Sequence, residues 1–347
     1  MIRSRFRGSL AVWVLLLAYA SLYPFVVRWP PGDSVAAAFG SMRYITTFDV
    51  VVNVVAYVPL GMLVCLHLLQ RGGTRSDAIL RATILGAAFS FAMETMQLFI
   101  PGRISSIYDT MANTAGTLCG ALALAEPFYS IATLPLGRKR EALVIPGAWG
   151  DAGLVLLMLW MIAQLNPALP FFGAGNIVGG GMDTGDLIFL QSAAVAVSVW
   201  GFGLFVSALL AAEAGALRVT LVLLSTALWL KFTAASLMLQ PHFAEEWVSA
   251  GRIVGLVVGV ALLVPTRRLA RTMRIYMALI LVLAGALFSK IVGAYSPLEE
   301  FLRVFRWPYG QLANFATLTR FLHELWPFIA VAYLIALFLH VRRRTVE

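Results

Sequence analysis

The chain has 347 residues, of which 60% are hydrophobic and only 12% are charged. A soluble domain carries about 25% charged residues, so the composition excludes a water-soluble globular protein and indicates an all-α protein with many membrane-spanning helices. The formal net charge of +9 does not predict nucleic-acid binding, because in a membrane protein the positions of basic residues matter more than their sum.

Apolar segments long enough to cross a bilayer as helices, about 20 residues each, recur along the whole chain. We predict ten spans, at residues 10–27, 49–69, 79–100, 109–125, 151–170, 187–211, 216–238, 249–265, 275–293 and 321–340. The first span also has features of a secretory signal peptide, because arginines precede it and Ala18-Tyr19-Ala20 has the small residues of a cleavage site. The apolar run continues to Val27, which favours a span.

The basic residues predict how the spans are oriented. They gather at both termini and in every second connection between spans, whereas the other connections contain few of them. These basic residues are Arg3, Arg5, Arg7, Arg71, Arg75, Arg81, Arg138, Lys139, Arg140, Arg218, Arg267, Arg268, Arg271, Arg274, Arg342, Arg343 and Arg344. The positive-inside rule therefore predicts that both termini and the even-numbered connections are cytoplasmic.

A change of composition divides the spans into two groups. Residues 127–150 contain three prolines, three glycines and the basic triplet Arg138-Lys139-Arg140, as is typical of a cytoplasmic linker. We therefore predict a four-helix membrane module at residues 1–126 and a six-helix membrane region at residues 151–347, joined by this linker.

Two outer loops contain similar stretches. Arg28-Trp29-Pro30-Pro31-Gly32 and Arg306-Trp307-Pro308-Tyr309-Gly310 each precede an amphipathic tract, at residues 33–46 and 311–320. Tryptophan concentrates at membrane interfaces, so both tracts are predicted to be short interfacial helices. A duplication would explain the similarity, and so would chance.

Polar side chains interrupt the apolar spans between residues 49 and 113. They are Asp49, Asn53, Glu94, Gln97, Asp109 and Asn113. Charge at membrane depth costs on the order of 3 kcal/mol per group, so such residues must pair, line a wet cavity or act on a ligand. Their i,i+3 and i,i+4 spacings place each pair on one helix face, and all six are predicted to converge near the outer ends of their helices.

Arg103 lies in the short loop among these residues and is expected to pair with Asp109 or Glu94. Its single charge does not balance three carboxylates, so a cationic or polar ligand, bound water or protonation must supply the rest. The alternative is that the polar groups only join the helices through hydrogen bonds worth about 0.6 kcal/mol each. The spacing of Gly116 and Gly120 predicts close approach of a neighbouring helix.

Three ordered blocks resemble the VanZ-like family over roughly residues 10–126. They are Asp49-Val-Val-Val-Asn53-Val-Val-Ala-Tyr-Val-Pro59-Leu-Gly61, Glu94-Thr-Met-Gln97-Leu-Phe-Ile-Pro101-Gly-Arg103 and Asp109-Thr-Met-Ala-Asn113-Thr-Ala-Gly116 with Gly120. The resemblance implies a four-span module in the bacterial cytoplasmic membrane and a link to resistance to the glycopeptide teicoplanin. It brings no established biochemical activity.

We expect a non-enzymatic cell-envelope protein, surrounded by membrane lipids, that binds a lipid-linked glycan precursor or a glycopeptide in an outer-leaflet polar groove. The residues predicted to line this groove are Asp49, Asn53, Glu94, Gln97, Arg103, Asp109 and Asn113. A transporter stays open because the chain has many spans, although transporters bind substrates near the midplane. A membrane enzyme with Glu94 or Asp109 as general base also stays open, although no histidine accompanies them. No cofactor or metal motif is present.

Three further residues carry expectations. Lys231 interrupts the seventh span and is expected to extend its amine towards the membrane surface, with Glu245 or Glu246 as an alternative partner. The chain has two cysteines, Cys65 and Cys119, both within apolar runs, where they are expected to pack as small apolar side chains without forming a disulfide.

Overall fold

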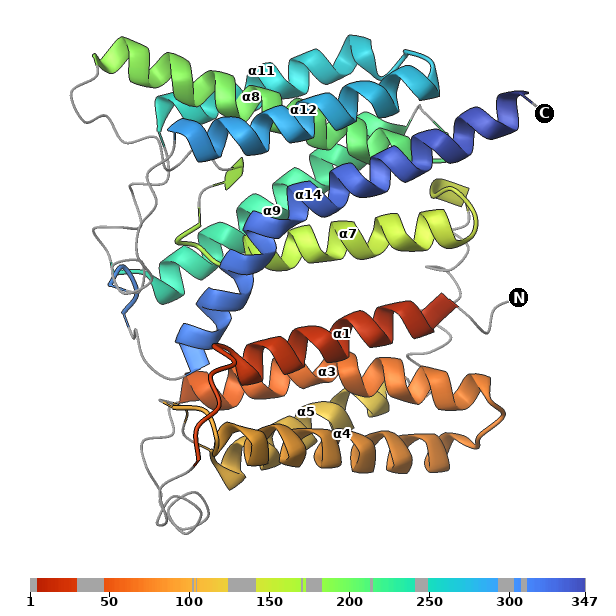
Figure 1. The fold of residues 1–347 in the computed structure, drawn as a ribbon, viewed down its shortest axis with the longest axis vertical. Helices are drawn as coiled ribbons and strands as arrows, with labels where there is room; N and C mark the ends of the chain where they lie inside the picture. The colour runs from red at the N-terminus through yellow and green to blue at the C-terminus, as the bar shows by residue number, and fades with distance from the viewer. Residues whose placement is uncertain are drawn as a thin grey trace. The chain divides into compact units, whose positions relative to one another are not determined.

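The computed structural model describes residues 5–29, 47–101, 103, 105–123, 142–169, 171–172, 183–212, 215–240, 249–292, 303–306 and 311–346. Within these ranges the chain forms ten long helices and no strand (Figure 1). The helices are α1 (Arg5–Leu22), α3 (Thr47–Gln70), α4 (Arg75–Gln97), α5 (Ile107–Ala123), α7 (Ala148–Gln164), α8 (Thr184–Leu209), α9 (Ala216–Met238), α11 (Ala250–Thr266), α12 (Arg271–Val292) and α14 (Gln311–Val346). The prediction of an all-α polytopic membrane protein is confirmed.

Many of these helices have the length and composition of membrane spans. The segments long and apolar enough to cross a bilayer are Asp49–Gln70, Arg75–Gln97, Thr184–Leu209, Ala216–Met238, Arg271–Phe288 and Phe315–Arg342. The shorter apolar helices are Gly8–Leu22, Ala148–Gln164 and Ala250–Thr266. Which side of the membrane holds the termini remains a prediction from the basic residues.

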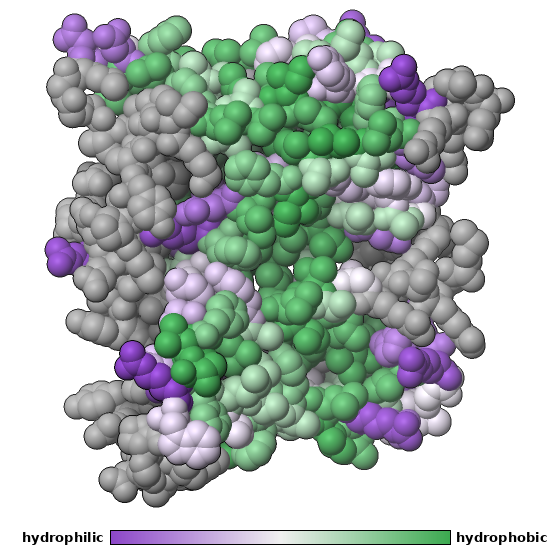
Figure 2. All heavy atoms as spheres, in the orientation of Figure 1, coloured by the Kyte–Doolittle hydropathy of each residue, from purple (hydrophilic) through white to green (hydrophobic). Residues whose placement is uncertain are grey.

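Large apolar side chains stay exposed on these helices, as a lipid-facing surface requires. Leu80 and Ile84 on α4, Val222 and Phe232 on α9, and Val257 on α11 are each more than half exposed. On the face shown in Figure 2, hydrophobic residues cover the middles of the helices and most hydrophilic residues lie towards their ends. In water such patches would favour aggregation, whereas lipid tails cover them without cost.

The chain divides into two compact units. Unit 1 comprises residues 1–138 and 309–318, and unit 2 comprises residues 139–308 and 319–347. The predicted linker lies outside the described residues as far as residue 141. Its final part is described, and Val144 and Ile145 are buried there against the end of α8, where the Ile145 N–H donates to the Leu209 carbonyl at 2.9 Å. The predicted module boundaries remain a prediction.

In unit 1, α3 packs along α5, and α4 contacts both helices. Glycines make this approach close, as the sequence predicts for Gly116 and Gly120. A Cβ atom would lie 2.2 Å from the Val54 carbonyl oxygen at Gly116 and 2.0 Å from the Val58 carbonyl oxygen at Gly120. Since residues 54 and 58 face residues 116 and 120 in the same order, α3 and α5 run parallel.

Helix α1 closes the core of unit 1. Its Leu17 is buried with Tyr57, Leu60 and Cys65 of α3. The indole Nε1 of Trp13 donates to the Ala56 carbonyl at 3.0 Å. The helix ends at Leu22, so the predicted span of residues 10–27 extends five residues too far, and the choice between a span and a cleaved signal peptide remains a prediction.

Unit 2 is built around α8, which contacts α9, α11 and α12. Gly255 on α11 permits one of these contacts, because a Cβ atom there would lie 2.5 Å from the Ser192 carbonyl oxygen. Aromatic rings fill much of the interior, where Trp160 stacks on Phe202 with ring centroids 4.1 Å apart. The indole Nε1 of Trp326 donates to the Leu156 carbonyl at 2.7 Å, so this buried ring has its polar atom satisfied.

One predicted interfacial helix has a different form. Residues 311–320 are not a separate helix but the first part of α14, which continues to Val346. Within α14, residues 311–326 contain no glycine or proline. Arg320 pairs with Glu324 at 3.3 Å, which joins the predicted interfacial tract to the predicted span that follows it. These i,i+4 charges favour a continuous helix. The other predicted interfacial helix, at residues 33–46, lies outside the described residues.

The two cysteines differ in their surroundings. Cys65 is buried, as expected, whereas Cys119 is exposed. Cys119 lies between Leu118 and Leu122, both also exposed, so it belongs to the apolar outer face of α5. Both thiols are free.

The expectation that Lys231 extends to the surface is wrong. The side chain is fully buried, and its Nζ donates to the Asn166 carbonyl at 2.7 Å, just beyond the end of α7. The Asn166 side chain is itself held by the hydroxyl of Thr319, 2.8 Å from its Nδ2. The carbonyls at a helix end lack helical partners, so Lys231 serves as a donor for one of them.

We expect the Lys231→Met variant to be at least as stable as the wild type. Removing the amine leaves the Asn166 carbonyl with only the Leu169 N–H as donor, at 3.4 Å, so the cost is at most about 1–3 kcal/mol. Taking an ammonium out of water costs several kcal/mol, and methionine of similar length avoids that cost. Thermal unfolding in detergent measures the difference. The control is Arg218→Met on the exposed side of the same helix, and a larger drop for Lys231→Met would contradict the expectation.

Candidate functional site

Buried polar residues gather where α3, α4 and α5 meet in unit 1. We call six of them the polar centre. They are Asn53 and Tyr57 on α3, Ser90 and Glu94 on α4, and Asp109 and Asn113 on α5. Each has less than a tenth of its surface exposed. A concentration of polar groups inside apolar helices requires either mutual satisfaction or a ligand.

The parallel packing of α3 and α5 explains how the centre is assembled. Because residue 54 lies level with residue 116, Asn53 and Asn113 enter at similar heights on neighbouring helices. Tyr57 follows Asn53 by one turn and lies close enough to Ser90, Glu94 and Asp109 for their groups to act on its hydroxyl. Of the seven predicted residues, the centre therefore brings together Asn53, Glu94, Asp109 and Asn113.

Some groups of the centre satisfy one another. The Nδ2 of Asn113 donates to the Ser90 hydroxyl at 2.8 Å. The backbone N–H of Ser106 donates to Oε2 of Glu94 at 2.8 Å, which ties the last turn of α4 to the loop before α5. These two hydrogen bonds are expected if the polar residues only join the helices to one another and bind no ligand.

Other groups of the centre have no hydrogen-bond partner in the structure. Two such atoms within the described residues are Nδ2 of Asn53 and Oδ1 of Asn113. The hydroxyl of Tyr57 lies beside the Ser90 side chain but makes no hydrogen bond of ordinary length. A buried polar atom without a partner costs about 1–3 kcal/mol, and most such atoms in proteins bind a water molecule or ligand. The purely structural interpretation therefore leaves part of the centre unexplained.

Arg103 does not pair with either carboxylate, so the expected ion pair is wrong. Its Nε and Nη2 donate to the Tyr23 carbonyl at 3.0 and 2.7 Å, and Nη2 also donates to the Ala20 carbonyl at 2.7 Å. Burial lowers the pKa of Arg103 to about 10, and the nearby charge of Glu94 opposes this shift. The guanidinium is thus cationic at neutral pH, and it compensates the negative end of α1.

Gln97 acts on the same helix end. Its Nε2 donates to the Ser21 carbonyl at 3.2 Å. Gln97 and Arg103 together supply donors to three carbonyls at or just beyond the end of α1, where helical partners are missing. Asp49 lies in the first turn of α3 and is only partly buried. These three predicted site residues therefore lie outside the polar centre.

Sequence reasoning missed Tyr57 and Ser90. The signal was available, because Tyr57 follows Asn53 by four residues and Ser90 precedes Glu94 by four, so each shares a helix face with a predicted residue. Serine and tyrosine are common in membrane helices without a role, and spacing alone did not separate them from the background. The described part of the chain contains no cluster of three or more histidine, cysteine or acidic side chains that could hold a metal ion.

Comparison with known proteins identifies the segment that carries the centre. The family described as VanZ/LLP1 matches residues 7–129, about a third of the chain. The match includes every residue of the polar centre as well as Gln97 and Arg103. Comparisons with curated proteins and with solved structures gave no match in either case. The N-terminal part of this membrane protein is therefore a VanZ-like module, built from α1, α3, α4 and α5.

Proposed function

We propose that the VanZ-like module binds the polar head group of an amphipathic envelope molecule at the polar centre. The ligand class is a lipid-linked glycan precursor or a glycopeptide, and the protein acts in the bacterial cytoplasmic membrane. By binding such a molecule it would alter resistance to glycopeptides such as teicoplanin. The observation that carries this proposal is the set of buried polar atoms without partners beside Glu94.

The energetic argument compares this proposal with purely structural hydrogen bonds. Interhelical hydrogen bonds in membranes contribute about 0.6 kcal/mol each on average. The atoms of Asn53 and Asn113 that lack partners cost about 1–3 kcal/mol each. The cost exceeds the gain, so helix association alone does not account for these residues. A ligand with several hydrogen-bonding groups recovers the difference.

The surface beside the centre suits an acyl or polyprenyl tail. Phe91 on α4 and Met111 on α5 are about half exposed or more, and both are close in sequence to residues of the centre. A head group at the centre would thus leave its tail along apolar helix faces that lipid already covers. This combination favours an amphipathic ligand over a small water-soluble one.

Thiol labelling in whole cells tests whether the centre admits water and ligand. Cys65 and Cys119 are first replaced by alanine, and single cysteines are then placed at positions 53, 94, 103 and 113. We expect a membrane-impermeant maleimide to label all four positions from outside, with slower reaction at the buried positions 53, 94 and 113. A cysteine at Val55, which is 61% exposed on the lipid-facing side of α3, is the control and stays unlabelled.

Labelling at position 103 alone would contradict the proposal. The polar residues would then be sealed between the helices, and their role would be structural. Equal labelling at Val55 would mean that the reagent enters the bilayer, and the comparison would have to be repeated with a larger maleimide.

A further inference from the structure

The guanidinium of Arg103, which was expected to supply positive charge at the ligand site, donates its hydrogen bonds to the end of α1 instead. Arg103 makes three hydrogen bonds, all to carbonyls of Ala20 and Tyr23. The centre itself therefore contains no cationic side chain from the described residues. This arrangement removes the main reason to expect an anionic head group.

The carboxylate of Glu94 dominates what remains. It is 6% exposed and accepts a hydrogen bond from the Ser106 N–H. It makes no ion pair within the described part of the chain, although the Ser105 side chain lies close enough to donate to it and the charge of Arg103 is near enough to attract it. Asp109 lies near enough for the two like charges to repel. A buried carboxylate held mainly by a neutral N–H donor is only partly compensated.

The atoms around Glu94 match a particular kind of ligand group. Oδ1 of Asn113 lacks a partner, the Tyr57 hydroxyl has only the Ser90 side chain beside it without a hydrogen bond of ordinary length, and both oxygens can accept hydrogen bonds. An ammonium group has three donors and no acceptor, so it can bond to Glu94, Tyr57 and Asn113 at once. A phosphate offers only acceptors and would be repelled by Glu94. A sugar hydroxyl can bond to these atoms but adds no positive charge, so the carboxylate stays only partly compensated.

We propose that the ligand of the polar centre carries a positively charged amine, which binds between Glu94, Tyr57 and Asn113. This inference rests on the proposed function and specifies the chemistry of its ligand. It assigns Glu94 as the counter-charge and the two neighbouring residues as neutral acceptors. Arg103 keeps its position at the end of α1 and takes no part in recognising the amine.

Three probes with the same dodecyl chain test the proposal on the purified full-length protein. The protein is held in a polyoxyethylene alkyl ether detergent, which has neither charge nor sugar. Thermal unfolding is then followed with dodecylammonium, dodecyl phosphate and dodecyl maltoside at pH 7. We expect dodecylammonium to raise the unfolding temperature in a saturable manner, and the other two probes to have a much smaller effect.

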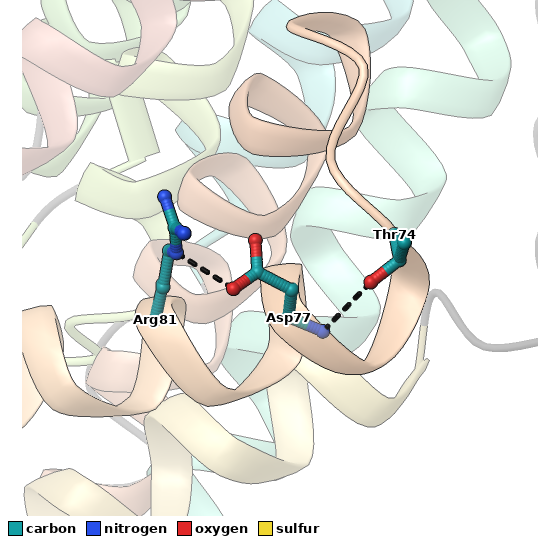
Figure 3. Close-up of polar contacts among 3 residues, drawn as sticks. All are labelled: Thr74, Asp77 and Arg81. Atoms are coloured by element: carbon teal, nitrogen blue, oxygen red, sulfur yellow. Dashed lines mark hydrogen bonds and ion pairs between the residues drawn. The ribbon is translucent and has the colours of Figure 1, made fainter.

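The variants identify where the amine binds. Glu94→Gln keeps the shape of the side chain and removes its charge, and we expect it to weaken dodecylammonium binding at least about tenfold. The matched control is Asp77→Asn, which removes a carboxylate at the exposed start of the same helix, where Asp77 pairs with Arg81 (Figure 3). It should bind like the wild type. If Glu94→Gln does not fold, Tyr57→Phe removes one acceptor and should weaken binding several-fold.

The outcomes separate this inference from the proposed function. If dodecyl phosphate binds and Arg103→Met weakens that binding, the proposal of an amine is wrong, but a ligand site remains. Binding of dodecyl maltoside equally to the wild type and to Glu94→Gln would also overturn the amine, in favour of a neutral head group. If no probe binds, the amine is rejected, and the labelling of positions 53, 94 and 113 decides whether the proposed site itself survives.

Discussion

Replacing Gly120 by alanine is expected to destabilise unit 1 by about 3 kcal/mol, at the upper end of the cost of overpacking. The added Cβ would lie 2.0 Å from the carbonyl oxygen of Val58 and 2.8 Å from its carbonyl carbon. Both atoms belong to the backbone of α3, so no side chain can turn aside. The two helices would have to separate by about 1 Å, and a gap of this size forfeits up to half of each dispersion contact.

The separation would affect the whole interface, because the other close contacts lie on the same pair of helices. Gly61 and Gly116 also place backbone against backbone between α3 and α5. The expected loss is therefore larger than that of a single overpacked side chain, and it extends to the polar centre, which these two helices build with α4.

Thermal unfolding in detergent measures this effect, with Gly8→Ala as the control. Gly8 lies on α1 of the same unit, and apart from its chain neighbours and the backbone of its own helix no atom lies within 4 Å of the position that its Cβ would take. Alanine has a higher helix propensity than glycine by about 1 kcal/mol, so this variant should unfold at the wild-type temperature or above it. Unfolding of Gly120→Ala at the wild-type temperature would mean that α3 and α5 are further apart than the structure has them.

The membrane helices were the most predictable part of the fold. Each predicted span corresponds to one helix, because a long apolar run has few alternatives to a helix when lipid is the solvent. The close approach at Gly116 and Gly120 was predictable for a similar reason, since the sequence shows where side chains are absent. The continuity of α14 through residue 320 was not predictable, because an amphipathic tract and a membrane-spanning tract can belong to one continuous helix.

The partners of the charged residues were the least predictable part. Arg103 and Lys231 were both expected to bind carboxylates or to reach the surface, and both instead donate to backbone carbonyls. Carbonyl groups are present at every residue, so the sequence does not show which of them lack a helical partner in the folded chain. The site residues Glu94 and Asn113 were found from their polarity, whereas the orientation of Arg103 required coordinates.

Arginines serve the ends of helices elsewhere in this chain. In unit 2, Arg274 donates to the Ser207 carbonyl and Arg271 to the Ala208 carbonyl, both in the last turn of α8. Arg306 donates from Nε at 2.7 Å to the carbonyl of Leu239, the residue that directly follows α9. Carbonyls at helix ends near a bilayer have less access to water, and a guanidinium satisfies them while its charge favours the negative helix end.

Arg103→Met is therefore expected to destabilise unit 1 by about 3 kcal/mol, because charge-assisted hydrogen bonds contribute about 1.5–3 kcal/mol each and the Ala20 and Tyr23 carbonyls would lose their donor. Arg103→Lys keeps the charge but not the forked geometry, so it should recover only part of the stability. Thermal unfolding of the purified protein ranks the variants.

The control is Arg81→Met, which removes an arginine that is 63% exposed and pairs with Asp77 on the surface of α4 (Figure 3). Exposed ion pairs contribute about 0–1 kcal/mol, so this variant should unfold within a few degrees of the wild type. The comparison also separates two roles for Arg103. An arginine that holds the end of α1 is needed for stability without any ligand, whereas one that binds a ligand is needed only when the ligand is present. If Arg103→Met is as stable as the wild type in the absence of ligand, Arg103 is not needed to hold the end of α1. It would then be a candidate ligand-binding residue, and the case for an amine ligand would be weaker.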